Sequence, residues 1–358
     1  MIGASSSYYG PGAYRTGAIP PIPASPKRRE RIGEELLPFG NYAGIDPYQQ
    51  LCEDAEFVQL QDRQDKAFYE TDDWWWDHQR IRFLKSQLGF TLLLVAFPFF
   101  YFCILVAIPS YLSFVFLSYA QSQEYNSVVA VLTSFAMLGG GLLGATVVGA
   151  YTCQTVMNSL FSFGSALLKP FRKKLSRRAN QYMENRCSEF NRQTGMVSFA
   201  QGKNKPPLKA PFVEFDGYVE RVVQRGGIFY RLMFVHRYTG KQFSQTSLSA
   251  IVDHKHEVHA TWDMLQRYMD VSQPMPDVPR LEPFRHLDPT TAEHDRQTGR
   301  DPRYWRDLDL EAWKAGEGAA HLKAQIEYPW PRQRCQLTPK LGKVEMAVYR
   351  ERQEAAAA

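Results

Sequence analysis

The chain has 358 residues, which allows two or three domains, and 42 Lys and Arg against 37 Asp and Glu give it a formal net charge of +5. The charged residues are segregated: none occurs in the 38 residues from Ser86 to Gln123 or in the 44 residues from Tyr125 to Leu168. This segregation argues against an entirely water-soluble fold. The five cysteines are scattered and include no Cys-x-x-Cys pair, which excludes a disulfide framework and a zinc ribbon.

Residues 1–50 form a basic arm that is rich in Pro, Ser and Tyr and has no acidic residue before Glu30. A basic, acid-free segment of this kind is typical of a mitochondrial presequence. The prolines between Pro20 and Pro26, however, would break the amphipathic helix that such a presequence needs. A targeting segment and a plain extended arm therefore both stay open.

Residues 51–87 predict an amphipathic, interfacial helix that leads into the triplet Trp74, Trp75 and Trp76. Tryptophan favours the membrane interface, because its ring is apolar while its N–H group needs a polar partner. We therefore expect the triplet to anchor the chain at a membrane interface. A cluster packed in a protein core or against a partner is the alternative.

Residues 88–168 predict a transmembrane hairpin with spans at about 88–119 and 128–151, since a bilayer core of about 30 Å needs roughly 20 apolar helical residues. Pro98 and Pro109 predict kinks in the first span. Neither span contains His, Asp, Glu, Lys or Arg, which argues against a bis-His haem, an ion path or a proton relay.

Basic residues flank the hairpin at both outer ends and are absent from its connecting loop, Gln121–Asn126. Arg80, Arg82 and Lys85 precede the first span, and a larger cluster follows the second. By the positive-inside rule, both long tails lie on the same side of the membrane, either the cytoplasm or the mitochondrial matrix.

The second span carries small residues at four-residue spacing in two rows. Gly140 and Gly144 form one row, and Gly141, Ala145 and Gly149 form the other. Small residues let helix backbones approach closely, so the rows predict a packing face for another helix, in this hairpin or in a partner subunit. The alternative is the general enrichment of glycine in membrane helices.

Residues 169–195 predict a basic amphipathic helix that begins near Pro170 and ends near Gly195. Six of its first ten residues are basic, namely Lys169, Arg172, Lys173, Lys174, Arg177 and Arg178. Such a cluster beside a membrane predicts a seat for anionic lipid headgroups such as cardiolipin. A topology signal without a specific lipid is the alternative, and the lack of interleaved aromatic residues argues against nucleic acid.

Residues 206–270 predict a small soluble α+β module. The expected elements are three strands and a helix, at Phe212–Gln224, Ile228–Tyr238, Lys241–Leu248 and His254–Met269. Both faces of the second strand are apolar, so we expect the sheet to be covered on both sides. About 60 residues make a marginal core by themselves.

Residues 271–358 predict an extended strap rich in Pro and Trp, with short helices near Thr290–Thr298 and Leu308–Ala324. A tail without a core of its own either stays disordered or lies on another surface. The aromatic and Arg residues of this tail favour the second outcome, with neighbouring subunits as the expected surface.

His254, His256 and His259 are the best candidates for metal binding or catalysis, because His256 and His259 could share one face of a helix. No second group of ligands with recognisable spacing follows, and the chain has no nucleophile elbow, zincin motif or dinucleotide fingerprint. Solvated or helix-capping histidines are the favoured interpretation. We therefore predict no catalytic residue, no cofactor, no bound metal and no small-molecule substrate.

Together these features predict a membrane-anchored α+β protein with a two-span transmembrane hairpin, flanking amphipathic helices, a small antiparallel β-meander with a helix, and extended Pro-rich termini. In architecture the chain resembles the accessory, supernumerary subunits of mitochondrial respiratory-chain complexes and ATP synthase. That resemblance implies a non-catalytic structural subunit of an energy-converting complex in the mitochondrial inner membrane, with both termini in the matrix. Its partners would be other subunits and membrane lipids, including cardiolipin. A membrane-tethered enzyme or metal protein that uses the three histidines, and a free membrane adaptor, are the alternatives.

Overall fold

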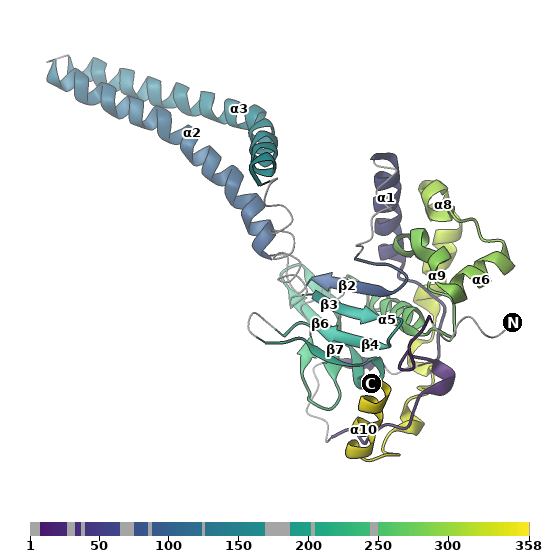
Figure 1. Ribbon diagram of the computed structural model, residues 1–358. Coiled ribbons are helices and arrows are strands. Elements are labelled where there is room, and N and C mark those ends of the chain that lie inside the picture. The colour runs from purple at the N-terminus through teal and green to yellow at the C-terminus, as the bar shows by residue number, and fades with distance from the viewer. Residues whose placement is uncertain are drawn as a thin grey trace. The chain divides into compact units, whose positions relative to one another are not determined.

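The structure is a computed structural model that describes residues 8–26, 33–36, 40–64, 75–84, 88–123, 126–168, 187–201, 205–243 and 250–357. The chain divides into two compact units. We call Met1–Lys85 together with Met183–Ala358 the two-sheet unit, and Ser86–Tyr182 the helical hairpin. The described residues combine helices with two antiparallel sheets (Figure 1), which confirms the expected mixture of α and β structure.

The helical hairpin consists of α2 (Leu88–Ser122) and α3 (Ser127–Leu168), which lie side by side (Figure 1). Both helices are long and apolar enough to cross a membrane, over Phe99–Ser122 and Ser127–Val156. The first predicted span and its aromatic continuation form one helix that passes through both prolines. The last turns of α3 bend away from α2 (Figure 1).

The two-sheet unit contains two four-stranded sheets in which all neighbouring strands are antiparallel. The first sheet has the order β1 (Glu34–Leu36), β6 (Phe215–Gln224), β7 (Gly227–His236) and β8 (Gln242–Phe243). The second has the order β2 (Arg80–Leu84), β3 (Cys187–Asn191), β4 (Met196–Phe199) and β5 (Leu208–Pro211). In the long β6–β7 hairpin the register runs from Phe215 opposite His236 to Gln224 opposite Gly227.

A phenylalanine-rich core joins the two sheets. Phe199 of β4 stacks on Phe243 of β8 with ring centroids 4.6 Å apart, and Phe190 of β3 lies 5.4 Å from Phe234 of β7. Helix α5 (Lys255–Met269) adds Trp262, whose ring lies 5.8 Å from Phe234. Aromatic pairs at these distances add to the free energy gained from the burial of apolar area.

The predicted meander and helix are confirmed in position, as β6, β7, β8 and α5. In the C-terminal half of β7 both faces are buried, with Leu232 and Phe234 on one face and Met233 and Val235 on the other. The predicted boundaries of the module, residues 206–270, are too narrow. The first sheet takes β1 from the N-terminal arm, and the second sheet takes β2 from residues 51–87. Strands β1 and β2 are stabilised by pairing with distant segments, and this pairing produces no local sequence pattern that would predict them.

The helix predicted over residues 169–195 is wrong at its C-terminal end. Residues 169–186 lie outside the described part of the chain, and residues 187–191 form β3, which pairs with β2 and β4. Phe190, which lies inside the predicted helix range, is fully buried between aromatic rings. Gly195 has a φ of +70°, and a Cβ there would overlap the backbone of Gly12 and Tyr14. It therefore serves the β3–β4 connection rather than a helix end.

The N-terminal arm is part of the core and not a plain extended segment in its described residues. Tyr14 packs edge to face on Phe212 at 5.2 Å, after which the arm forms a short 3₁₀ turn, η1 (Thr16–Ala18). The Ile22 N–H donates to the Lys340 carbonyl (3.0 Å), and both Ile22 and Leu36 are buried. The expected helix of residues 51–87 is α1 (Tyr48–Gln64).

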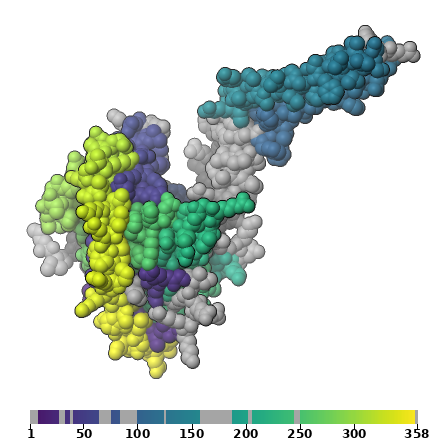
Figure 2. All heavy atoms as spheres, turned by 180° about the vertical axis from the view of Figure 1, so that it is seen from behind, coloured from purple at the N-terminus to yellow at the C-terminus, as the bar shows by residue number. Residues whose placement is uncertain are grey.

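The C-terminal segment folds into a series of short helices. They are η6 (Pro279–Leu287), α6 (Pro289–Thr298), α7 (Tyr304–Asp307), α8 (Leu310–Ala315), α9 (Glu317–Glu327), η7 (Trp330–Arg332), η8 (Thr338–Lys340) and α10 (Met346–Ala357). The expected helix near Thr290–Thr298 is confirmed as α6, and the one near Leu308–Ala324 is divided at Gly316 into α8 and α9. Figure 2 shows this segment, in yellow-green and yellow, along one side of the two-sheet unit.

Candidate functional site

The three histidines at the start of α5 do not converge on one point. His254 and His256 stack on each other with ring centroids 5.1 Å apart. His256 Nδ1 lies 2.8 Å from Gln325 Nε2, whereas His259 stacks on Trp330 at 5.4 Å. Each of the last two histidines therefore contacts a residue of the C-terminal segment.

Burial disfavours the charged form of the His256 and His259 side chains. Burial, followed by the charge of Lys255, lowers the pKa of His259 to about 4, and burial and His254 lower the pKa of His256. Among the described residues, no three His, Cys, Asp or Glu side chains come together as a metal-binding group. The arrangement supports neutral histidines that hold the C-terminal segment on α5.

A buried ion pair, Arg192 with Asp288, connects the β3–β4 turn to the start of α6. Arg192 Nε donates to Asp288 Oδ1 (3.1 Å), and both side chains are inaccessible to solvent. Arg192 also donates to the carbonyls of Asp270 (2.9 Å) and Gln273 (2.8 Å), while the Tyr9 hydroxyl donates to Asp288 (2.7 Å). Burial acts to raise the pKa of Asp288, but the charge and hydrogen bonds of Arg192 hold it below its ordinary value.

A second buried carboxylate, Glu214, fixes α10 to the sheet. His236 Nε2 lies 3.0 Å from Glu214 Oε2, Arg350 Nη1 donates to Oε1 (2.9 Å), and Gln353 Nε2 donates to Oε1 (2.8 Å). Burial alone would raise the pKa of Glu214, but the hydrogen bonds from His236, Arg350 and Gln353 lower it to about 2. Every group in this cluster has a partner within the chain, which is the arrangement expected of a structural clamp.

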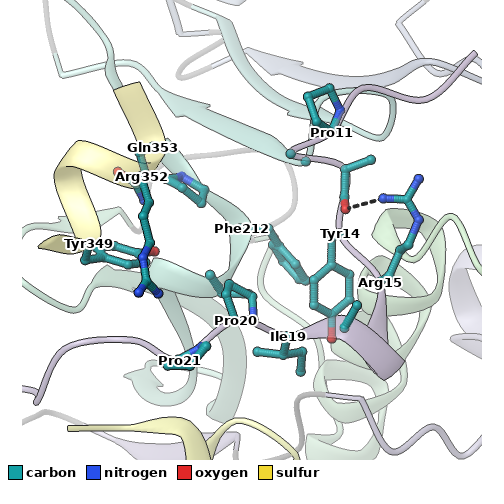
Figure 3. A pocket seen from close by; sticks show the side chains of 16 residues that line it. Pro11, Tyr14, Arg15, Ile19, Pro20, Pro21, Phe212, Tyr349, Arg352 and Gln353 are labelled. Carbon is teal, nitrogen blue, oxygen red and sulfur yellow. Dashed lines mark hydrogen bonds between the residues drawn. The ribbon is translucent and has the colours of Figure 1, made fainter. Parts of the chain in front are cut away.

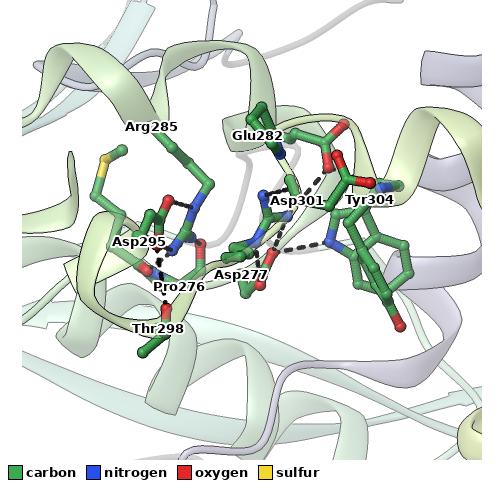
Figure 4. Close-up of polar contacts among 12 residues, drawn as sticks. Pro276, Asp277, Glu282, Arg285, Asp295, Thr298, Asp301 and Tyr304 are labelled. Atoms are coloured by element: carbon green, nitrogen blue, oxygen red, sulfur yellow. Dashed lines mark hydrogen bonds and ion pairs between the residues drawn. The ribbon is translucent and has the colours of Figure 1, made fainter. Parts of the chain in front are cut away.

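Several Arg and Trp residues of the expected strap have polar partners within the chain (Figure 4). Arg300 Nε donates to Asp277 Oδ2 (2.6 Å), and the Trp305 indole donates to Asp277 Oδ1 (3.0 Å). Arg285 Nη2 donates to Asp295 (2.6 Å), and Trp305, Trp313 and Trp330 are buried. The expectation that these residues reach onto neighbouring subunits is therefore wrong for this set, because they hold the segment on its own unit.

The two rows of small residues in α3 have different surroundings. A Cβ on Gly141 would overlap Pro109 of α2, a Cβ on Gly149 would lie 3.3 Å from Phe102 and Leu105, and Ala145 is buried. This row is the inner face of the hairpin. Nearby, the Ser113 hydroxyl donates to the Ser134 carbonyl (2.8 Å).

Gly140 and Gly144 are exposed, and a Cβ on either would meet no atom within 4 Å among the described residues. Tyr151 stands on the same side of α3 by helical spacing and is 82% exposed. The predicted packing face thus separates into an inner row that α2 occupies and an outer row that is open.

The membrane-interface residues of the sequence analysis lie partly outside the described chain. Trp74 and the basic cluster Lys169, Arg172, Lys173, Lys174, Arg177 and Arg178 are outside it. Trp76 is buried in the core and meets Phe83 edge to face at 5.9 Å, as the core-cluster alternative expects. Trp75 is more open, with the Arg82 guanidinium 5.8 Å from its ring.

Sequence reasoning missed Arg192, Glu214 and Asp288 as members of buried clusters. Asp288 caps α6 by accepting from the Thr291 N–H (3.1 Å), with Pro289 in the first turn of the helix. Nothing local marks Arg192 or Glu214, because their partners are far away in the sequence. No protein-family model, curated protein or solved structure matches the chain.

Proposed function

We propose that this protein is a membrane-anchored, non-catalytic accessory subunit of a multi-subunit energy-converting complex of the mitochondrial inner membrane. The observation that carries the proposal is the helical hairpin, whose large apolar side chains point outward. Phe99, Phe135 and Leu143 are each more than 60% exposed. Such a surface is stable in a bilayer and unstable in water.

The open row on α3 supports lateral association within the membrane. Between helices in lipid, close van der Waals contact is the main source of attraction, and small residues permit it. On α3, the row of Gly141, Ala145 and Gly149 packs against α2, whereas Gly140 and Gly144 leave a second surface of small residues open among the described residues. A partner helix from another subunit is the occupant that the proposal expects.

The proposed orientation puts both termini in the matrix. It rests on the basic residues that flank the hairpin at its outer ends. The connecting loop, Gln121–Asn126, has no basic residue and one acidic residue, Glu124. Protease added to mitoplasts should therefore spare epitope tags at both termini, and digestion should follow only after the membrane is permeabilised. Loss of the C-terminal tag in intact mitoplasts would contradict the orientation and the matrix location.

A free membrane adaptor is the second candidate. The observation in its favour is that the two-sheet unit buries Trp305, Trp313 and Trp330 against itself. Such a unit needs no neighbouring subunit to cover these three tryptophans. The two candidates differ in whether the protein migrates in a large assembly after mild extraction from the membrane.

Lateral association has a direct test on α3. Gly144→Leu should leave the hairpin folded, because the site is open, but should release the protein from its assembly on a native gel. Ala150→Leu is the matched control, since Ala150 is exposed and lies on a different side of the helix. Equal behaviour of the two variants would remove the support that this row gives to the proposal.

A further inference from the structure

The two-sheet unit contains a cavity of about 300 Å³ between the N-terminal arm and α10 (Figure 3). We call it the arm cavity. Tyr14, Ile19 and Phe212 line it on one side, and Tyr349 and Arg352 of α10 line it on the other. Its volume is at the lower end of the roughly 300–1,000 Å³ that small-molecule sites have.

Fixed points on both sides of the arm hold this cavity open. The Gly10 N–H donates to the Gln193 carbonyl (2.9 Å), and the Tyr14 carbonyl accepts from the Val271 N–H (3.1 Å). Beyond the cavity, Ile22 is hydrogen-bonded to Lys340. Pro20 and Pro21 lie between these points and have no N–H with which to pair to a strand. The arm therefore bows over Phe212 and cannot close the space by extending a sheet.

The opposite wall is equally fixed. Helix α10 is held by Arg350 and Gln353, which both donate to the buried carboxylate of Glu214. Arg352 lies between these two residues in sequence but takes no part in that cluster. The cavity is therefore present before any ligand binds, which lowers the entropic cost of binding.

The chemistry of the lining is apolar with a positive rim. Buried Ile19, Phe212 and Val213 supply apolar surface. The charged lining residues are Arg15 and Arg352, and none of the described residues that line the cavity is Asp or Glu. Arg15 donates to the Ala13 carbonyl (3.2 Å), whereas Arg352 is exposed and has no ion pair among the described residues. In Figure 3 its side chain runs beside Tyr349, across from Pro20 and Pro21.

We propose that the arm cavity binds a small amphiphilic monoanion, with its apolar body on Phe212 and Ile19 and its carboxylate head on Arg352. A guanidinium that has no ion pair within the described part of the chain is a good partner for such a head. The volume of about 300 Å³ limits the body to a short acyl chain or a single ring. The proposal does not depend on the identity of the complex.

The test uses the full chain in nanodiscs of zwitterionic phosphatidylcholine, which offer no anionic lipid as competitor. Two carboxylates serve as ligands: octanoate represents a lipid-derived acid, and 3-phenylpropanoate represents a water-soluble aromatic acid. Two further probes serve as controls, because octanol lacks the anionic head and inorganic phosphate lacks the apolar body. Calorimetric titration should show saturable binding of at least one carboxylate, with octanol and phosphate each at least tenfold weaker. The tighter of the two carboxylates identifies the source.

Two variants at exposed positions separate the head from the body. Arg352→Gln should weaken carboxylate binding at least tenfold and leave octanol binding unchanged, and Ala18→Trp, which fills the mouth of the cavity, should abolish both. Arg334→Gln, an exposed arginine away from the cavity, should have no effect. Absence of carboxylate heat above that of empty nanodiscs would overturn the proposal. Equal binding by octanol, or by the Arg352 variant, would do the same.

Discussion

The two units of this chain place polar and apolar groups in opposite ways. In the two-sheet unit the most deeply buried side chains include charged ones, such as Arg192, Asp288 and Glu214. In the helical hairpin the inner face is made of small residues, while Phe99 and Leu143 are on the outside. The difference fits the proposal of a membrane-anchored protein, in which the two-sheet unit faces water and the helical hairpin faces lipid.

The units also differ in what specifies their folds. Charged pairs between distant segments help to specify the two-sheet unit, since an arginine that is removed leaves a buried carboxylate without its counter-charge. Close packing at the small residues of α3 holds the hairpin together, and in the proposed membrane setting it would be the main attraction, because lipid provides no hydrophobic drive between helices. The following predictions change residues in each of the two units, in order of decreasing expected effect.

The largest expected effect is that of Arg192→Ala, which leaves the charge of Asp288 buried without its counter-charge. The free energy of unfolding of the two-sheet unit should fall by about 3–5 kcal/mol. Tryptophan fluorescence during denaturation in detergent measures this change. Arg296→Ala removes an exposed pair with Glu293 in α6, where the side chains are 76% and 50% accessible, and should cost less than about 1 kcal/mol. Similar losses in both variants would contradict the structural role of the buried pair.

A second prediction concerns the hairpin. Gly141→Leu drives a side chain into Pro109 and should destabilise the α2–α3 pair by about 1–3 kcal/mol. Gly144→Leu meets open space and should leave the thermal stability of the hairpin unchanged. Helicity followed during heating in nanodiscs separates the two variants. A hairpin that tolerates Gly141→Leu but not Gly144→Leu would show that the inner face is assigned to the wrong row.

The third prediction concerns pH. The pKa of Glu214 is lowered from 4.5 to about 2 in the folded chain, so its contribution to stability is present above pH 4.5 and is lost as pH falls toward 2. Arg350→Gln removes one cause of the shift and should flatten this dependence. At pH 7 the variant should lose only about 1 kcal/mol, because Arg350 is 40% exposed. The difference in unfolding free energy between wild type and variant, measured at several pH values, checks both statements.

The smallest effect is expected from His254→Gln, His256→Gln and His259→Gln together. The lowered pKa of His259 means that the unfolded chain binds a proton more readily between pH 4 and 6.5, so wild-type stability declines as pH falls through that window. The triple variant should decline less there, and the activity of the host complex should change little at neutral pH. A dead complex with an intact fold would favour the enzyme alternative, as would one bound metal per chain.

Prediction from sequence succeeded where the pattern is local. The uncharged stretches gave both apolar helices, and alternation gave β6 and β7, since a period of two or a long apolar run depends only on neighbouring residues. It failed for β3, where Cys187 and Phe190 fit a helical stripe equally well. Residues 187–191 form a strand because they pair with β2, which precedes the whole helical hairpin in the sequence.

The site residues follow the same rule. The two glycine rows could be read from their spacing, but only the contact with Pro109 shows which row α2 occupies. The Trp and Arg residues of the C-terminal segment were recognised as anchors, whereas the surface that they bind was misjudged. Their partners, such as Asp277 and Glu282, lie nearby in sequence but carry no mark that distinguishes an internal partner from a solvated acid.

Native-gel migration after mild-detergent extraction, followed by identification of the co-migrating proteins, tests the central claim most directly. A non-catalytic subunit should run with a large inner-membrane complex and enter it in fixed stoichiometry with the energy-converting subunits. Migration of the intact chain as a monomer or a simple oligomer, with no such subunits beside it, would contradict the claim and leave the free membrane adaptor in its place.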